Sequence, residues 1–89
     1  MNFTHYDLGQ LDNGDVVQIS LHGSAANIRL MDNSNFSSYR SGHQYRYVGG
    51  LAKQTPIRLQ VPSYGHWHVA VDMAGLRGTV RSAIQVIRA

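Results

Sequence analysis

The chain has 89 residues, 43% of them hydrophobic and 15% charged, which suits a single small globular domain spanning 1–89 with one core. It contains no cysteine, which excludes disulfide bonds, thiolate metal sites and a thiol nucleophile. The formal net charge of +3 permits an acidic partner but is small beside that of dedicated polyanion binders. The sequence has neither a signal-peptide pattern nor an apolar run of about 18 residues, so we expect a cytoplasmic protein with no membrane span.

Short strands are predicted along most of the chain, because hydrophobic and polar residues alternate between closely spaced turn signals. In 16–21, for example, Val17, Ile19 and Leu21 share one face. Strands are expected over 2–6 at a sheet edge, 16–21, 25–31, 43–53, 56–61, 65–73 and 79–87. The residues of four of these strands that are expected to face the core are Val17, Ile19, Leu21, Ala26, Ile28, Leu30, Ile57, Leu59, Val61, Val80, Ile84 and Val86.

The segment 32–42 interrupts this alternation and predicts one short helix over 33–41. It begins with Asp and Asn, which cap helices, it places Phe36 and Tyr39 on one face, and Gly42 follows its end. About seven short strands need a second layer to enclose a core. We therefore expect an all-β fold, either a small two-sheet β-sandwich (jelly-roll-like) or a barrel of about seven strands.

The stretch GHWHVAVD places the only tryptophan of the chain between two histidines. In a strand, Trp67 falls on the hydrophobic face and anchors the core, so replacing it with alanine should cost ~3–5 kcal/mol. The alternation sends His66 and His68 to the opposite face, where we expect solvent-facing imidazoles that hydrogen-bond locally. The inward set is Trp67, Val69, Val71 and Met73, and the outward set is His66, His68, Ala70 and Asp72.

A metal site at His66 and His68 is the first alternative. Histidines two residues apart lie roughly 6.6 Å apart along a strand, and their ring nitrogens can converge on zinc or another divalent metal. Asp72 lies about 13 Å beyond His68, too far to join them. The third ligand would have to come from another strand, and the candidates are His5, His22 and His43. No cofactor is expected apart from this metal.

Arginines and tyrosines interleave in YRSGHQYRY, where Arg46 could bind phosphate and a tyrosine could stack on a base. The competing interpretation is that Tyr45 and Tyr47 cover the core. Weak binding of nucleic acid or another polyanion by surface arginines is a second alternative, which we do not favour. It would require a sheet that brings together Arg29, Arg58 and Arg81.

No catalytic constellation is visible: glutamate is absent, most aspartates lie in turn contexts, and neither a nucleophile elbow nor a phosphate loop occurs. We therefore expect a non-enzymatic recognition module, monomeric or homodimeric, for a small ligand or a protein partner. The candidate ligand-binding residues are Tyr39, Arg46, Tyr64, His66 and His68. An exposed apolar patch marking the site would involve Met31, Tyr39, Tyr64 or Ile87.

Five segments occur in a specific order: NFTHYDLG, SAANIRLMDNSNFSSYRSG, VGGL, PIRLQVPSYGHWHVAVD and LRGTVRSAIQV. Together they resemble the DUF1883 family over essentially the whole chain. The resemblance implies a compact, mostly β bacterial domain, sometimes found beside a Toll/interleukin-1 receptor-like (TIR) domain, with no defined activity or ligand. It also implies a pattern centred on Gly65, Trp67 and Asp72 that does not require a histidine at the position of His68.

Overall fold

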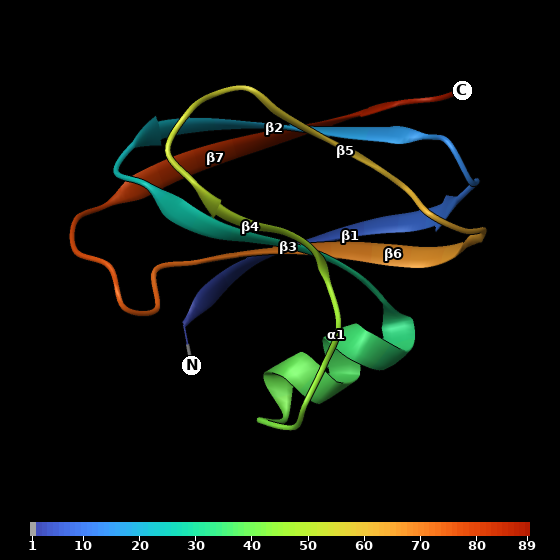
Figure 1. Cartoon of the computed structure of the whole chain (residues 1–89), viewed down its shortest axis with the longest axis horizontal. Helices are drawn as coiled ribbons and strands as arrows, with labels where there is room; N and C mark the ends of the chain where they lie inside the picture. Colours follow the sequence, from blue (N-terminus) through green and yellow to red (C-terminus); the bar gives the residue numbers. More distant parts are fainter. Residues whose placement is uncertain (1) are drawn as a thin grey trace.

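The computed structural model describes residues 2–89, which form seven strands and one helix. The elements are β1 (Phe3–Leu11), β2 (Val16–Gly23), β3 (Ala26–Asp32), α1 (Asn33–Arg40), β4 (Val48–Ala52), β5 (Ile57–Gln60), β6 (Gly65–Asp72) and β7 (Val80–Ile87). Two antiparallel sheets, ordered β1-β6-β3-β4 and β5-β2-β7, face each other (Figure 1). The predicted all-β sandwich is thus confirmed, and the sheets do not close into a barrel.

The main core lies between the two sheets and contains every residue that the alternation pointed inward. Trp67 anchors it at 6% exposure, and its indole Nε1 donates a hydrogen bond of 2.9 Å to the carbonyl of Ser63. This bond satisfies the one polar atom of the ring, so the indole is buried without an unpaired donor. The predicted core anchor is confirmed.

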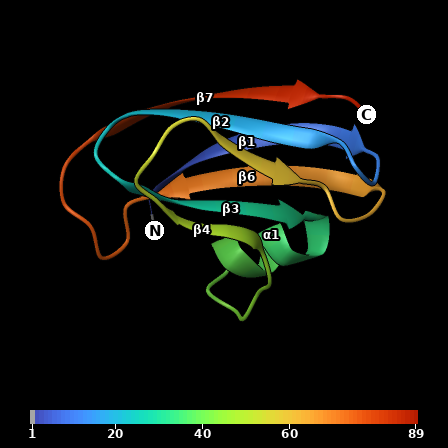
Figure 2. The same cartoon turned by 45° about the horizontal axis from the view of Figure 1, so that its top comes forward.

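A third layer covers part of the outer face of the four-stranded sheet, where α1 packs against β3 and β6 (Figure 2). Asp32 caps the helix by accepting a hydrogen bond of 2.9 Å from the amide of Asn35, as its first residues predicted. Phe36 and Tyr39 point to the sheet and bury Met31 and Ala70 beneath them. We call these four residues the helix-side cluster.

The helix corrects one prediction about the outer face of β6. His66, His68, Ala70 and Asp72 do lie opposite Trp67, but the last three are buried, with His68 at 6% exposure. Only His66 keeps partial contact with solvent. The expectation of two solvent-facing imidazoles is therefore wrong for His68, because alternation assigns a face but does not show that α1 covers it.

Two strand boundaries also differ from expectation. The strand predicted over 43–53 begins only at Val48, because the preceding residues run beside α1: the amide of Arg46 binds Oδ1 of Asn35 at 2.8 Å. The predicted edge strand at the amino terminus is confirmed and extends to Leu11. A β-bulge between Asp7 and Gly9 shifts its pairing with β6.

Candidate functional site

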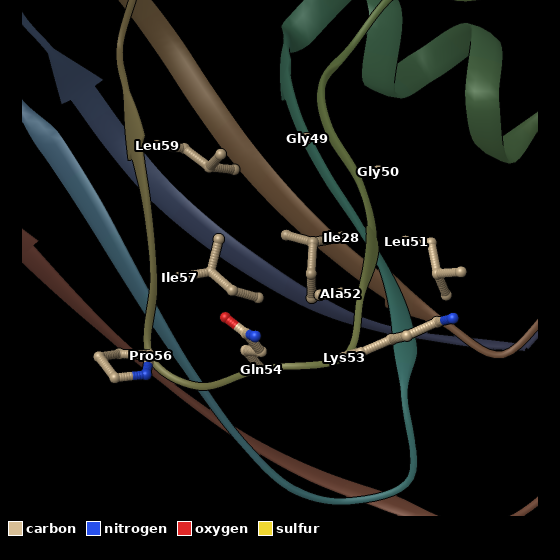
Figure 3. A pocket seen from close by; sticks show the side chains of 10 residues that line it. All are labelled: Ile28, Gly49, Gly50, Leu51, Ala52, Lys53, Gln54, Pro56, Ile57 and Leu59. Atoms are coloured by element: carbon tan, nitrogen blue, oxygen red, sulfur yellow. The ribbon is translucent and has the colours of Figure 1, made fainter.

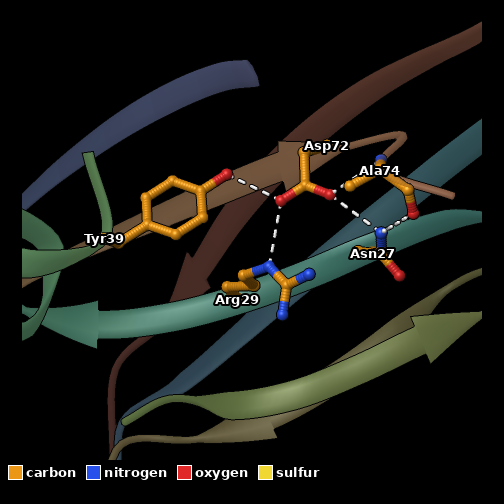
Figure 4. A network of polar contacts seen from close by, with 5 residues as sticks. All are labelled: Asn27, Arg29, Tyr39, Asp72 and Ala74. Atoms are coloured by element: carbon orange, nitrogen blue, oxygen red, sulfur yellow. Dashed lines mark hydrogen bonds and ion pairs between the residues drawn. The ribbon is translucent and has the colours of Figure 1, made fainter. Parts of the chain in front are cut away.

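Asp72, the last residue of β6, accepts four hydrogen bonds on the outer face of the sheet (Figure 4). Its Oδ1 binds Nδ2 of Asn27 at 2.8 Å and the amide of Ala74 at 3.1 Å. Its Oδ2 binds Nε of Arg29 at 2.9 Å and the hydroxyl of Tyr39 at 2.6 Å. The amide of Ala74 belongs to the turn that follows β6, while the three side chains come from β3 and α1.

These contacts fix the charge of each group. Burial opposes the ionisation of Asp72, but the hydrogen bonds from Arg29, Tyr39 and Asn27 outweigh it and lower the pKa to about 2. Burial, reinforced by the bond to Asp72, raises the pKa of Tyr39 above its usual value. Burial opposes the charge of Arg29, yet the bond to Asp72 raises its pKa overall. The network is therefore an arginine–carboxylate ion pair with a neutral tyrosine at neutral pH.

Arg29 uses only Nε in this network, and its two Nη groups make no hydrogen bond to any residue from 2 to 89. No side-chain nitrogen or oxygen in that range is both buried and unpaired, so these Nη groups reach solvent. The guanidinium carbon lies 4.8 Å from the ring centroid of Tyr47 and 5.8 Å from that of Tyr45. Arg29 is thus held by Asp72 and by aromatic rings while part of its donor set stays free.

The free donors open into a pocket of about 690 Å³, which we call the Arg29 pocket. Its lining residues are Arg29, Asn35, Gln44, Tyr45, Arg46 and Tyr47. Tyr45 packs edge-on against Tyr39 of the helix-side cluster, with ring centroids 5.0 Å apart, while Tyr47 is 43% exposed. Neither tyrosine covers the main core. Of the predicted ligand contacts, Arg46 lies in the pocket, and buried Tyr39 lies behind it.

Other predicted residues are not brought together. Tyr64, 69% exposed, lies in the turn between β5 and β6 and lines neither the Arg29 pocket nor the β4–β5 groove described below. The four residues considered for an apolar patch do not lie together, because Met31 and Tyr39 are buried and Ile87 belongs to the other sheet.

The three arginines of the polyanion alternative are also separated. Arg29 lies on the outer face of the four-stranded sheet, whereas Arg58 pairs with Gln18 and Arg81 with His22 on the three-stranded sheet. The outer faces of the two sheets point in opposite directions, so the three arginines do not lie on one surface.

A second polar cluster lies where β1 meets β6. Nε2 of His66 contacts Oδ1 of Asp7 at 2.6 Å, and donor atoms of Asp7, His66 and His68 all lie within 4.8 Å of one another. Sequence reasoning missed Asp7, because its neighbours depend on strand pairing and on the bulge that follows it. Backbone hydrogen bonding from Gly9, followed by the bond from His66, lowers the pKa of Asp7.

His68 is the buried member of this cluster. Its Nδ1 lies 2.9 Å from Nε2 of His5, and its Nε2 contacts Oδ1 of Asn33. Its ring stacks on Phe36 at 4.5 Å and on His66 at 4.8 Å, and burial lowers its pKa. Of the three histidines considered as further ligands, only His5 lies beside the pair. The other two are His22, on β2 in the other sheet, and His43, which follows α1.

A mostly apolar groove of about 610 Å³ opens between the edge strands β4 and β5 (Figure 3). Ile28, Ile57 and Leu59 line its floor and walls, while Leu51 lies on the far side of β4. Gly49 makes the close approach of β4 possible, because a Cβ there would lie 2.4 Å from the carbonyl oxygen of Ile28. Within residues 2–89, Lys53 is the one charged residue that lines this groove.

Comparison with known proteins identifies a family but no characterised relative. A family model described as a domain of unknown function, DUF1883, matches residues 1–89. No curated protein and no solved structure matches the chain. Within residues 2–89, no helix is long and apolar enough to cross a membrane.

Proposed function

The chain belongs to the DUF1883 family, whose function is unknown, and from its own geometry we propose that it is a non-enzymatic recognition module. The Arg29 pocket is the proposed ligand site. Its ligand is a small molecule that carries a carboxylate or phosphate next to a planar ring. The observation that carries the proposal is the guanidinium of Arg29, held in place by Asp72 while its Nη groups stay open to the pocket.

The anionic part of the ligand follows from the donors. A guanidinium presents its N–H groups in a fixed fork that matches the two oxygens of a carboxylate or phosphate. Asp72 and Tyr39 fix the plane of Arg29 in advance, so little side-chain entropy is lost when a ligand binds. Arg46 on the pocket rim adds a positive charge that no acidic residue of the pocket lining offsets.

The planar part follows from the two tyrosines. Tyr45 and Tyr47 lie 5.7 Å apart with their rings tilted by 39°, and both line the pocket beside Arg29. Aromatic rings in such a position offer a stacking face for a flat group. A volume of about 690 Å³ is within the range of small-molecule sites.

Binding without catalysis fits the protonation states around the pocket. General acid–base catalysis needs a group whose pKa lies near the working pH. The pKa of Asp72 is about 2, so this carboxyl is ionised near neutral pH, and the pKa of Tyr39 is raised above its usual value, so its hydroxyl stays protonated. Neither group exchanges protons readily near neutrality. The pocket lining itself contains no histidine, aspartate or serine.

The test is a titration of the ¹⁵N-labelled chain with phenyl phosphate, followed by amide and arginine Nε chemical shifts. We expect saturable shifts over 44–48 and at Nε of Arg29, whereas neutral benzyl alcohol should give much smaller ones. Arg46→Ala should weaken phenyl phosphate binding several-fold, because it removes a positive charge from the pocket rim. The substitution should leave the fold intact, since the Arg46 side chain is exposed and makes no hydrogen bond within residues 2–89. Arg81→Ala, on the outer face of the other sheet, is the matched control and should bind as the original chain does.

Three results would refute the proposal: no shifts at millimolar phenyl phosphate, shifts that map to the β4–β5 groove, or equal weakening by both substitutions. Retention on heparin that depends on Arg58 and Arg81 would instead favour the polyanion alternative. Binding of a protein partner in place of a small ligand stays a prediction. A cytoplasmic location stays a prediction as well.

A further inference from the structure

The cluster at the edge of the four-stranded sheet offers a different chemistry from the Arg29 pocket. We propose that Asp7, His66 and His68 bind a divalent transition-metal ion of the zinc type. Two imidazole nitrogens and one carboxylate are ligands that zinc accepts, and three protein ligands leave a fourth position open. The proposal concerns other residues than the Arg29 pocket and does not depend on it.

The pairing of β1 with β6 places the carboxylate beside the histidines. Asp7 pairs directly with His68, so both side chains lie on the same face of the sheet, and a β-bulge follows before Gly9 pairs with Trp67. The amide of Gly9 donates to Oδ1 of Asp7 at 3.0 Å, and the same oxygen lies 2.6 Å from Nε2 of His66. The carboxylate is thus aimed along the sheet edge toward both imidazoles.

The spacing of the donor atoms suits one ion after a small contraction. The three donor atoms lie within 4.8 Å of one another. Tetrahedral ligands at the usual zinc distances are separated by about 3.4 Å, so movements of about 1 Å are enough. Asp7 and His66 have side chains 55% and 31% exposed, so both can make this movement and an ion can enter from solvent.

One ring must also turn. The rings of His66 and His68 lie face to face, with centroids 4.8 Å apart and planes at 18°, whereas a ligating nitrogen points its lone pair in the plane of its ring. Phe36 and Asn33 hold the ring of His68 in place. Oδ1 of Asn33 accepts a hydrogen bond from Nε2 of His68, which leaves Nδ1 of His68 to bind the ion. A histidine that binds a metal usually donates its other ring N–H to an oxygen of this kind, which fixes the orientation of the ring. His66, bonded only to Asp7, is the ring that turns, and His5 gives up its contact with Nδ1 of His68.

The experiment uses the full chain without a histidine tag and titrates it with zinc chloride by calorimetry. We expect one ion per chain and a rise in melting temperature, because an ion that binds only the folded state stabilises it. Asp7→Asn and His66→Ala should each weaken zinc binding at least tenfold. His43→Ala and His22→Ala are matched controls, exposed histidines outside the cluster, and should leave binding unchanged.

Histidine side-chain ¹⁵N shifts of the unsubstituted chain give a second measurement that does not depend on how any variant folds. Zinc should shift one ring nitrogen of His66 and Nδ1 of His68, with little change at His43. No binding at millimolar zinc would overturn the proposal, and so would binding that Asp7→Asn and His66→Ala leave intact. Since neither substitution touches the Arg29 pocket, phenyl phosphate binding should be the same in these variants.

Discussion

The hydroxyl of Tyr39 donates a hydrogen bond of 2.6 Å to Oδ2 of Asp72, which ties the last turn of α1 to the end of β6. The same oxygen accepts from Nε of Arg29, so one buried carboxylate fixes both the helix and the arginine of the proposed ligand site. This is why a helix of only eight residues, with serine and asparagine at five of its positions, stays on the sheet.

Removing that hydroxyl should weaken the fold. Tyr39→Phe keeps the ring in the helix-side cluster but takes one donor from a buried, charged acceptor. The free energy of unfolding should fall by about 2 kcal/mol, the usual worth of a hydrogen bond to a charged group. Urea denaturation measures this change. Tyr64→Phe is the control, because that ring is 69% exposed, and an equal loss in both variants would contradict the role given to Tyr39.

Asp72 should make stability depend on acid pH. Its pKa is about 2 in the folded chain, against about 3.9 for an ordinary aspartate in the unfolded chain. The folded state therefore binds this proton less readily, so the stabilisation is complete above about pH 4 and is lost as pH falls toward 2. The loss should be about 2 kcal/mol.

The carboxyl ¹³C shift of Asp72 measures this titration directly in the unsubstituted chain. Asp72→Asn should remove the corresponding part of the acid-induced loss of stability. A midpoint for Asp72 near 4 would show that the hydrogen bonds do not favour its ionised form.

The single tryptophan reports on the main core. Because Trp67 is 6% exposed, its fluorescence should be blue-shifted in the native chain and poorly quenched by acrylamide, with both properties lost in urea. Trp67→Ala should cost ~3–5 kcal/mol, and Trp67→Phe less, since it keeps an aromatic ring in the site. A red-shifted, freely quenched native spectrum would mean that the two faces of β6 are assigned the wrong way round.

Alanine substitutions at two glycines should distinguish the loss of stability caused by backbone strain from that caused by steric overlap. Gly42→Ala introduces a Cβ into open space at a φ of 79°, so it should cost about 1 kcal/mol. Gly49→Ala combines a φ of 127° with a Cβ 2.4 Å from the carbonyl oxygen of Ile28, so β4 must move away from β3. Thermal unfolding should show a clearly larger loss for Gly49→Ala, and equal losses would mean that β4 is free to shift.

Strand β6 illustrates which features of the fold could be predicted from the sequence and which could not. The alternation around Trp67 predicted its inner face, because burial between two sheets selects large hydrophobic residues at every second position. The pattern of 32–42 likewise predicted a short helix with Phe36 and Tyr39 on one face, and these two side chains dock on a surface of the sheet. It did not indicate that this surface is the outer face of β6 itself, since periodicity in a strand carries no information on what covers it.

The same limit explains the two candidate sites. The interleaved arginines and tyrosines of 39–47 pointed to Arg46, but Arg29 joins them only through the pairing of β3 with β6 and the path of the chain after α1. The histidine pair was visible in sequence, while Asp7 stands 59 residues from its partner His66. A contact across that separation depends on the register of β1 against β6.

Local alternation and turn residues act over a few neighbouring positions, and they were enough to indicate a small all-β sandwich with Trp67 inside. The burial of His68 and Asp72 by α1, and the meeting of distant side chains at Arg29 and at Asp7, depend on contacts between segments far apart in the chain. Such meetings arise from strand order and register, which are set by the packing of the whole chain and not by any segment alone.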